Sequence, residues 1–296
     1  EAPLNFERDN LSTRILEKFN MKPRKADLSD WKKFVKKIHN GYKAIKIGIV
    51  GKYFHTGDFI LSDAYLSVIE AIKHAAWEHN RKPVITWLDA ESYEKDHRKL
   101  VELKKYDGIV IPGGFGNRGV EGKIQVIKYI REKNIPFLGL CYGLQLATIE
   151  YARNVCKLKD ANTTEVNPHT KYPVIHTLPE QLMNIQEKKM GGSMRLGSYT
   201  CETLPNTKAN RAYGAKLITE RHRHRYEVNN DYRDILEKNG LTFSGINPER
   251  NLIEIIELKN HPFFLATQFH PEFKSRPLAP HPLFLAFMKA SAKRNP

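Results

Sequence analysis

The sequence predicts an α/β fold: a doubly wound, mainly parallel central sheet with flanking helices and a smaller mixed or antiparallel portion. From residue 44 onward, short apolar segments rich in Ile and Val alternate with helix-length segments. Alternation of this kind indicates parallel strands joined by crossover helices. Two of the strands also stop at glycine-containing turns that open a helix. Because ligand sites in such sheets lie at the carboxyl ends of the strands, we expect the site at these two turns.

The regular part begins with a strand at 45–50, followed by a helix over 62–79 whose N-cap is Ser62 or Asp63. A strand at 84–88 comes next. After it we expect a polar helical stretch, a strand at 107–111, a helix at 120–133, a strand at 136–140 and a helix at 143–153.

The last part of the chain has shorter strands. Residues 174–258, which include an apolar run at 252–257, predict mixed or antiparallel pairing. A buried strand at 263–269 and a helix from Pro282 follow. We expect one domain over 44–296.

The first 43 residues are charged and helical in pattern, with Pro3 and Pro23 as expected breaks, and we interpret 1–43 as a linker segment. One stripe predicts a packed helix face, with lysines on the opposite side: Trp31, Phe34, Val35 and Ile38. The chain begins without Met and without a hydrophobic signal core, so we expect it to be a fragment.

Composition excludes some functional classes. The formal net charge is +15, but it is spread along the chain, and the aromatic residues beside the lysines belong to the packing stripe, so nucleic-acid binding is not favoured. No apolar stretch approaches the length that spans a membrane, so no membrane-spanning helix is expected. Three cysteines without metal-ligand spacing indicate a reducing, cytoplasmic compartment and no metal site.

Cys141 stands at the centre of Gly139-Leu140-Cys141-Tyr142-Gly143, between a buried apolar run and a helical pattern. A strand, a sharp turn and a helix in this order force the apex residue into strained torsions, and flanking glycines let the strand and helix approach closely. The turn presents the sulfur at a helix N-terminus. The pattern favours a nucleophile, and a small buried core residue is the alternative.

His270 and Glu272 follow the expected strand at 263–269. A cysteine nucleophile needs a base, and the base needs an acceptor that orients it. Residues two apart at a strand end have side chains on the same side, and Pro271 stiffens the bend between them. The alternative is a loop histidine beside a solvated glutamate.

A glycine-rich loop, Pro112-Gly113-Gly114-Phe115-Gly116-Asn117-Arg118-Gly119, follows another buried strand. Its backbone N–H groups suit either an oxyanion hole or a phosphate. Lys123 does not stand in a Gly-Lys-Ser/Thr setting, which excludes a Walker loop.

Taken together, Pro-Gly-Gly-Phe-Gly at 112–116, Gly-Leu-Cys-Tyr-Gly-Leu-Gln at 139–145 and Gln-Phe-His-Pro-Glu at 268–272 resemble the class I (triad) glutamine amidotransferase domain. Over about residues 45–292 the resemblance is to the glutaminase domain of CTP synthases. Four stretches carry it: Asp-Ala-Asn-Thr-Thr-Glu at 160–165, Gly-Gly-Ser-Met-Arg-Leu-Gly at 191–197, Glu-Arg-His-Arg-His-Arg-Tyr-Glu-Val-Asn at 220–229 and Phe-His-Pro-Glu-Phe at 269–273.

The resemblance implies glutamine hydrolysis through a γ-glutamyl thioester by a triad of Cys141, His270 and Glu272. It implies an oxyanion hole made by Gly114 and Tyr142. The glutamine-binding positions that it implies are Gly114, Tyr142, Gly143, Leu144, Gln145, Glu165 and Arg225. Tyr142 replaces the leucine usual in the family, which leaves its backbone role intact.

The resemblance also implies partners outside this chain. In the family, ammonia passes to an N-terminal amidoligase domain that aminates UTP with ATP and magnesium, GTP activates the glutaminase step, and the full-length enzyme is a homotetramer. Residues 191–197 match a mobile lid associated with GTP. Glutamine hydrolysis itself needs no cofactor. The alternatives are a triad glutaminase serving GMP, anthranilate or carbamoyl phosphate synthesis, or a catalytically silent regulatory domain of the same fold.

Overall fold

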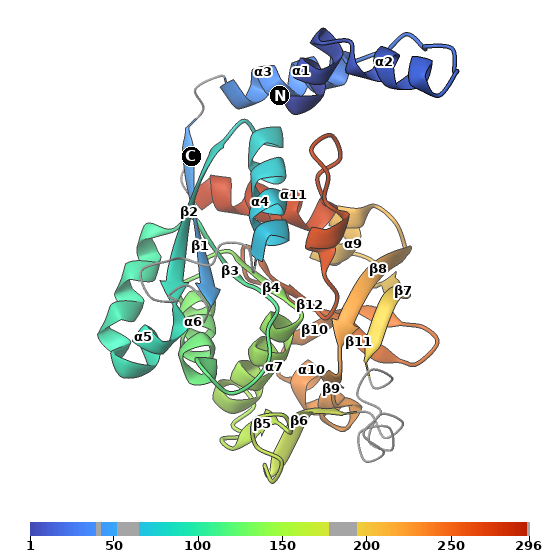
Figure 1. Cartoon of the computed structure of the whole chain (residues 1–296). Coiled ribbons are helices and arrows are strands. Elements are labelled where there is room, and N and C mark those ends of the chain that lie inside the picture. Colours follow the sequence, from blue (N-terminus) through green and yellow to red (C-terminus); the bar gives the residue numbers. More distant parts are fainter. Residues whose placement is uncertain (40–42, 52–64, 178–193, 295–296) are drawn as a thin grey trace.

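The computed structural model describes residues 1–39, 43–51, 65–177 and 194–294 (Figure 1). Its main feature is a nine-stranded sheet in the order β2-β1-β3-β4-β12-β11-β10-β7-β8. The strands are β1 (Ala44–Gly51), β2 (Lys82–Asp89), β3 (Gly108–Ile111), β4 (Phe137–Leu140), β7 (Arg195–Thr203), β8 (Leu217–His224), β10 (Leu241–Asn247), β11 (Leu252–Leu258) and β12 (Phe264–Thr267).

The sheet has a parallel half and an antiparallel half. β2, β1, β3, β4 and β12 pair in parallel, whereas β11, β10, β7 and β8 continue the sheet in antiparallel pairs. In the register of β4 with β12, Leu140 lies opposite Thr267. The carboxyl ends of these two strands, which lead to Cys141 and His270, therefore lie side by side.

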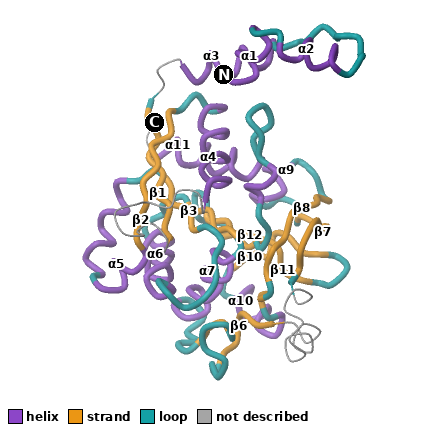
Figure 2. The backbone as a smooth tube through the Cα atoms, in the orientation of Figure 1, coloured by secondary structure: helices purple, strands orange, loops and turns teal. Residues whose placement is uncertain are grey.

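Helices cover both faces of the sheet, as Figures 1 and 2 show. One face packs against α5 (Ala90–Lys95), α6 (Val120–Glu132), α7 (Tyr142–Asn154) and α10 (Arg233–Lys238). The other packs against α4 (Leu66–Glu78), α9 (Lys208–Tyr213) and α11 (Pro282–Arg294). Within the described residues, 3-10 helices also occur at η2 (His97–Lys105), η4 (Asn230–Tyr232) and η5 (Pro271–Lys274).

A small second sheet, of order β5-β6-β9, mixes parallel and antiparallel pairing. Its strands are β5 (Ala161–Thr163), β6 (Tyr172–Thr177) and β9 (Tyr226–Val228). The predicted fold class is therefore confirmed, including its smaller mixed portion. The expected helix caps, Ser62 and Asp63, lie outside the described residues.

The N-terminal segment forms α1 (Ala2–Arg8), α2 (Leu11–Lys18) and α3 (Ser29–His39), which lie beyond the main body in Figure 1. Pro3 does not break a helix as predicted, because it occupies the first turn of α1, where its missing N–H has no helical partner to lose. Pro23 does lie in a non-helical stretch.

Phe34 of the predicted stripe is buried, with its ring edge-on to Trp77 at 5.6 Å between ring centroids. The boundary at residue 43 stays a prediction.

Two features are absent from the described part of the chain. No helix there is long and apolar enough to cross a bilayer. No cluster of three or more His, Cys, Asp or Glu side chains within the same residues has the arrangement of a metal site.

A buried ion pair joins α6 to α7, the helix that begins beside Cys141. The Arg131 guanidinium donates to both carboxylate oxygens of Glu150, at 2.9 and 2.8 Å. Glu150 is fully buried, and burial raises the pKa of this carboxyl although Arg131 opposes the rise. Arg131 therefore compensates a charge that α7 carries into the core.

We expect Arg131→Met to lower the free energy of unfolding by about 3 kcal/mol, because it leaves the buried Glu150 carboxylate without a compensating positive charge. Urea denaturation followed by circular dichroism measures the change. The double variant Arg131→Met/Glu150→Met should recover most of the loss. A double variant as unstable as the single one would contradict this account.

Candidate active site

Cys141 lies in a strained turn between β4 and α7. Its φ of 51° and ψ of −96° are unusual for a residue with a side chain, and its N–H donates to the Thr267 carbonyl at 2.6 Å. At Gly143 the backbones approach so closely that a Cβ atom would lie 2.4 Å from the Ile111 carbonyl oxygen. The predicted strand–turn–helix geometry around Cys141 is confirmed.

His270 and Glu272 form a buried pair, as their spacing predicts. The imidazole Nδ1–H donates to the Glu272 Oε1 atom at 2.7 Å. Phe273 stacks on the imidazole with ring centroids 5.1 Å apart, and the His270 N–H donates to the Arg221 carbonyl at 2.8 Å. The ring is therefore held by Glu272 and Phe273, its backbone is held by Arg221, and its tautomer places the second proton position at Nε2.

The electrostatics of His270 connect it to Cys141. Burial of the imidazole opposes its protonation, but the Cys141 sulfur and then the Glu272 carboxylate outweigh burial, and the pKa of His270 is raised well above its usual value. Nε2 is buried and makes no hydrogen bond to any residue that the structure describes. This nitrogen is therefore available to exchange a proton with the sulfur or with a substrate.

The glycine loop after β3 closes against both residues. A Cβ atom at Gly113 would lie 2.8 Å from His270 Cε1 and 3.6 Å from Cys141 Cβ. Gly113, His270, Glu272 and Phe273 line a cavity of about 150 Å³ together with the first turn of α4. A larger cavity of about 890 Å³ lies between α9 and α11, and none of the three predicted catalytic residues lines it.

Gly116 in this loop is held at both of its backbone polar groups. Its N–H donates to Glu165 Oε1 at 2.8 Å, and its carbonyl accepts from the Tyr142 hydroxyl at 2.6 Å. A Cβ atom at Gly114 would lie 3.6 Å from the Tyr142 ring. The structure thus gives Tyr142 a side-chain contact beyond the predicted backbone role, and it shows Glu165 bonded to the loop.

Gln145 and Gln268 lie behind the sulfur. Gln268, which is fully buried, points its amide Nε2 at Cys141 Sγ at 3.8 Å, and Gln145 Nε2 donates to Gln268 Oε1 at 3.5 Å and to the Tyr226 carbonyl at 3.0 Å. Gln145 Oε1 is buried and unpaired among the described residues. Leu144 packs its side chain in the hydrophobic core. Gln268 is not among the site residues predicted from the sequence, although its place two residues before His270 is a signal.

The Arg-His-Arg-His-Arg run forms the end of β8, where side chains alternate between the two faces. Arg221 and Arg223 are exposed, whereas His222 and His224 are buried. The Arg223 carbonyl lies 4.0 Å from Cys141 Sγ. Arg225, half-buried, follows the strand. The run therefore contributes backbone to the site and buries its two histidines behind it.

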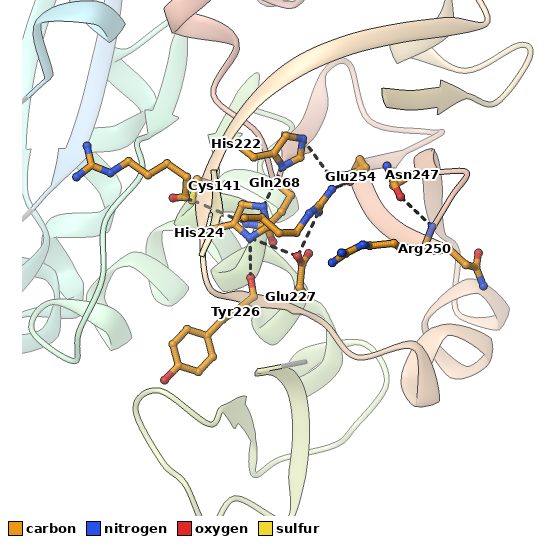
Figure 3. Close-up of polar contacts among 12 residues, drawn as sticks. Cys141, His222, His224, Tyr226, Glu227, Asn247, Arg250, Glu254 and Gln268 are labelled. Carbon is orange, nitrogen blue, oxygen red and sulfur yellow. Dashed lines mark hydrogen bonds and ion pairs between the residues drawn. The ribbon is translucent and has the colours of Figure 1, made fainter. Parts of the chain in front are cut away.

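These histidines belong to a buried ionisable network, part of which Figure 3 shows. Arg195 donates to Glu227 at 3.1 Å and to Glu254 at 2.9 Å, and His222 Nδ1 lies 2.9 Å from His224 Nε2. Burial raises the pKa of Glu227 to about 8 and that of Glu254 to about 7, against the opposing effect of Arg195. Burial and then Arg195 lower the pKa of His222 to about 3.

The segment predicted as a lid is described only in part. Residues 191–193 lie outside the described residues. Arg195–Gly197 belong to β7 and pair with β8, and Arg195 is buried. This portion is a strand, and the predicted lid function stays a prediction.

The raised pKa of His270 predicts a pH-dependent contribution to stability. In an unfolded chain the pKa of histidine is about 6.5. Because the pKa of His270 is higher in the folded protein, its protonation adds stability that is complete below about pH 6.5 and is lost as the pH rises through the folded pKa. Glu272→Gln removes one cause of the rise. We expect this variant to lose more unfolding free energy near pH 6 than in alkaline buffer.

Denaturant unfolding at a series of pH values measures this dependence. Glu132→Gln, at an exposed carboxylate, serves as the control and should show a small, nearly pH-independent change. A loss for Glu272→Gln that is constant over the pH range would contradict the coupling.

Comparisons with known proteins agree with this geometry. A family model described as Glutamine amidotransferase class-I matches residues 60–290. A protein named CTP synthase from Caldanaerobacter subterraneus is 51% identical over 292 residues, which are 98% of this chain and 52% of that protein. A CTP synthase from Sulfolobus acidocaldarius is 49% identical over 99% of this chain and 54% of its own length. The chain thus spans about half the length of the curated relatives it matches.

Among solved structures, the glutaminase domain of Trypanosoma brucei CTPS with bound acivicin superimposes with a TM-score of 0.76 at 37% identity. The match covers 84% of this chain and 94% of that one. A putative GMP synthase subunit from Thermoplasma acidophilum, at 17% identity and a TM-score of 0.53, shares the fold. The chain belongs to the class I glutamine amidotransferases, and within that family it is similar to the glutaminase domain of CTP synthases.

Proposed function

We propose that this chain hydrolyses L-glutamine to glutamate and ammonia through a γ-glutamyl thioester on Cys141. The observation that carries the proposal is the strained turn at Cys141 beside the buried His270–Glu272 pair, in a member of this family. A cysteine with a purely structural role would need neither of two features seen at Cys141: its positive φ, and a neighbouring histidine whose pKa the sulfur raises.

In the proposed mechanism, His270 takes the thiol proton at Nε2, and the Cys141 sulfur attacks the carboxamide carbon of glutamine. The carbonyl π electrons move to the oxygen, forming a tetrahedral oxyanion. His270 then protonates the leaving nitrogen, which departs as ammonia. Water, giving a proton to His270, cleaves the thioester and releases glutamate. Glu272 orients the imidazole and stabilises its charged form.

Backbone N–H groups of Gly114 and Tyr142 are proposed to stabilise the oxyanion. Tyr142 begins α7, so its N–H has no partner within the helix. The backbone of Gly143 and Leu144 and the side chain of Gln145 are proposed to line the substrate pocket.

The two charged ends of glutamine require opposite charges. Glu165 is proposed to hold the α-ammonium and Arg225 the α-carboxylate. The Glu165 carboxylate accepts a hydrogen bond from the glycine loop. It also lies close enough to Tyr226 that its charge, as the second cause after burial, raises the pKa of that phenol. Arg225 directly precedes Tyr226, which supports a shared location.

For the whole protein we propose the activity named in its relatives. An N-terminal amidoligase domain, joined through 1–43, would use the ammonia to aminate UTP with ATP and magnesium, and GTP would activate the glutaminase of 44–296. We further propose a homotetramer in the cytoplasm. The relatives' double length supports an additional domain. High turnover of glutamine by this chain without GTP would contradict the proposed activation.

Intact-mass measurement after incubation with 6-diazo-5-oxo-L-norleucine, an electrophilic glutamine analogue, tests the site without requiring turnover. We expect one stoichiometric adduct on the parent protein and none on Cys141→Ala, because Cys141 is the proposed nucleophile. Cys156→Ala, at the half-buried cysteine of the opposite end of α7, should label like the parent.

An unlabelled parent, with or without GTP, would favour the alternative of a catalytically silent domain. An adduct that persists in Cys141→Ala would place the reactive group elsewhere. Either result would overturn the assignment of Cys141.

A further inference from the structure

Two side chains from different elements hold the same residue of the glycine loop. Tyr142, the first residue of α7, donates its hydroxyl to the Gly116 carbonyl at 2.6 Å. Glu165, in the turn after β5, accepts the Gly116 N–H at 2.8 Å. The backbone N–H and carbonyl of Gly116 are thus both bound by side chains from outside the loop. We call these two hydrogen bonds the Gly116 clamp.

The Tyr142 side chain is itself rigidly placed. It is 1% exposed, and its ring packs beside Gly114 with the Lys123 ammonium 5.5 Å from the ring centre. Burial, followed by the Glu165 charge, raises the pKa of the Tyr142 phenol, so its hydroxyl remains a donor. A protonated, immobile phenol gives the Gly116 carbonyl a defined position.

The loop has no regular secondary structure at this point. Residues 112–119 connect β3 to α6 without regular structure, and Gly116 has a φ of 75° that few other residues adopt. Gly113, in the same loop, is in close contact with His270 and Cys141. A displacement of Gly116 is therefore transmitted within a few residues to the reacting groups.

Oxyanion stabilisation depends on such displacements. Two N–H groups from separate segments must converge on one oxygen, and supporting residues must hold them to within a fraction of an ångström. Tyr142 belongs to one segment, next to Cys141, and its hydroxyl binds the other. The bond therefore ties the two segments directly.

We propose that Tyr142 is a positioning residue: its side chain, through the Gly116 clamp, aligns the Gly114 N–H with the Tyr142 N–H for attack by Cys141. The inference rests on the proposed glutaminase function and deepens it. Glu165 holds the other side of the clamp with one oxygen while its charge remains for the substrate ammonium. Alignment and substrate binding are thus separable, because Gln at position 165 can still accept the Gly116 N–H.

The rate of Cys141 labelling by 6-diazo-5-oxo-L-norleucine, measured against its concentration, tests this separation. The reagent's carbonyl takes the place of the glutamine carbonyl. Sulfur adds to it and the π electrons move to the oxygen, which forms the oxyanion; a proton from His270 goes to the diazo carbon, and the carbonyl re-forms as sulfur shifts to that carbon and N₂ leaves. For Tyr142→Phe we expect the limiting rate to fall about 3- to 10-fold, the effect of one hydrogen bond, at an unchanged half-saturating concentration. For Glu165→Gln we expect the half-saturating concentration to rise about 10-fold at a nearly unchanged limiting rate.

Tyr151→Phe is the matched control. Tyr151 lies on the same helix, is nearly as buried, and donates its hydroxyl to a backbone carbonyl, that of Asn239, at the same 2.6 Å. It does not touch the loop, so its labelling kinetics should equal those of the parent. Thermal unfolding checks that the three variants remain folded.

If the parent protein is labelled and Tyr142→Phe shows the same limiting rate, the proposed positioning role of Tyr142 is wrong, while the proposed function stands. An equal loss in Tyr151→Phe would also overturn the positioning role, since the effect would then be one of general packing. An unlabelled parent would overturn the proposed function and the clamp with it.

Discussion

The site depends on the parallel pairing of β4 with β3 on one side and β12 on the other. That pairing brings the carboxyl ends of three strands together, and each end supplies one part: the glycine loop, Cys141 and His270. The Cys141 N–H continues the β12 ladder through its 2.6 Å bond to the Thr267 carbonyl. The strained cysteine is thus anchored by the same backbone hydrogen bonds that build the sheet, which is how a positive φ persists there.

The buried ionisable network behind β8 also helps to position the site, because it joins the two sheets. Arg195 of β7 binds Glu227 of β9 and Glu254 of β11, so it joins the small sheet to the large one. Buried charges are weak evidence for stability, because desolvation offsets much of their attraction. Burial raises the pKa values of both carboxyls and lowers those of both histidines, so it favours the neutral form of each of these four groups. The geometric effect of the network is to hold β8, whose backbone carbonyls at Arg221 and Arg223 contact the His270 N–H and Cys141 Sγ.

Local patterns were sufficient to predict the main body of the fold and the three catalytic candidates. Apolar runs, glycines and the His-Pro-Glu spacing are short-range signals, and the observed strands and helices begin and end within a few residues of their expected positions. Contacts across long sequence separations were not predictable in this way. Gln268 and Cys141 are 127 residues apart, and Tyr142 and Gly116 are 26 apart. Pro3 was misjudged because a proline break and a proline in a first turn have the same local sequence.

Strand register positions residues at the ends of strands, but its influence weakens along a loop. Cys141 directly follows β4 and is bound to β12, whereas Gly114 is three residues and Gly116 five residues beyond the end of β3 at Ile111. An oxyanion hole that takes one N–H from each region therefore needs a second constraint on the loop. Tyr142 and Glu165 supply that constraint through side chains, at a residue whose backbone has both polar groups engaged. This explains why the phenol of Tyr142, next to Cys141, is bonded to the loop.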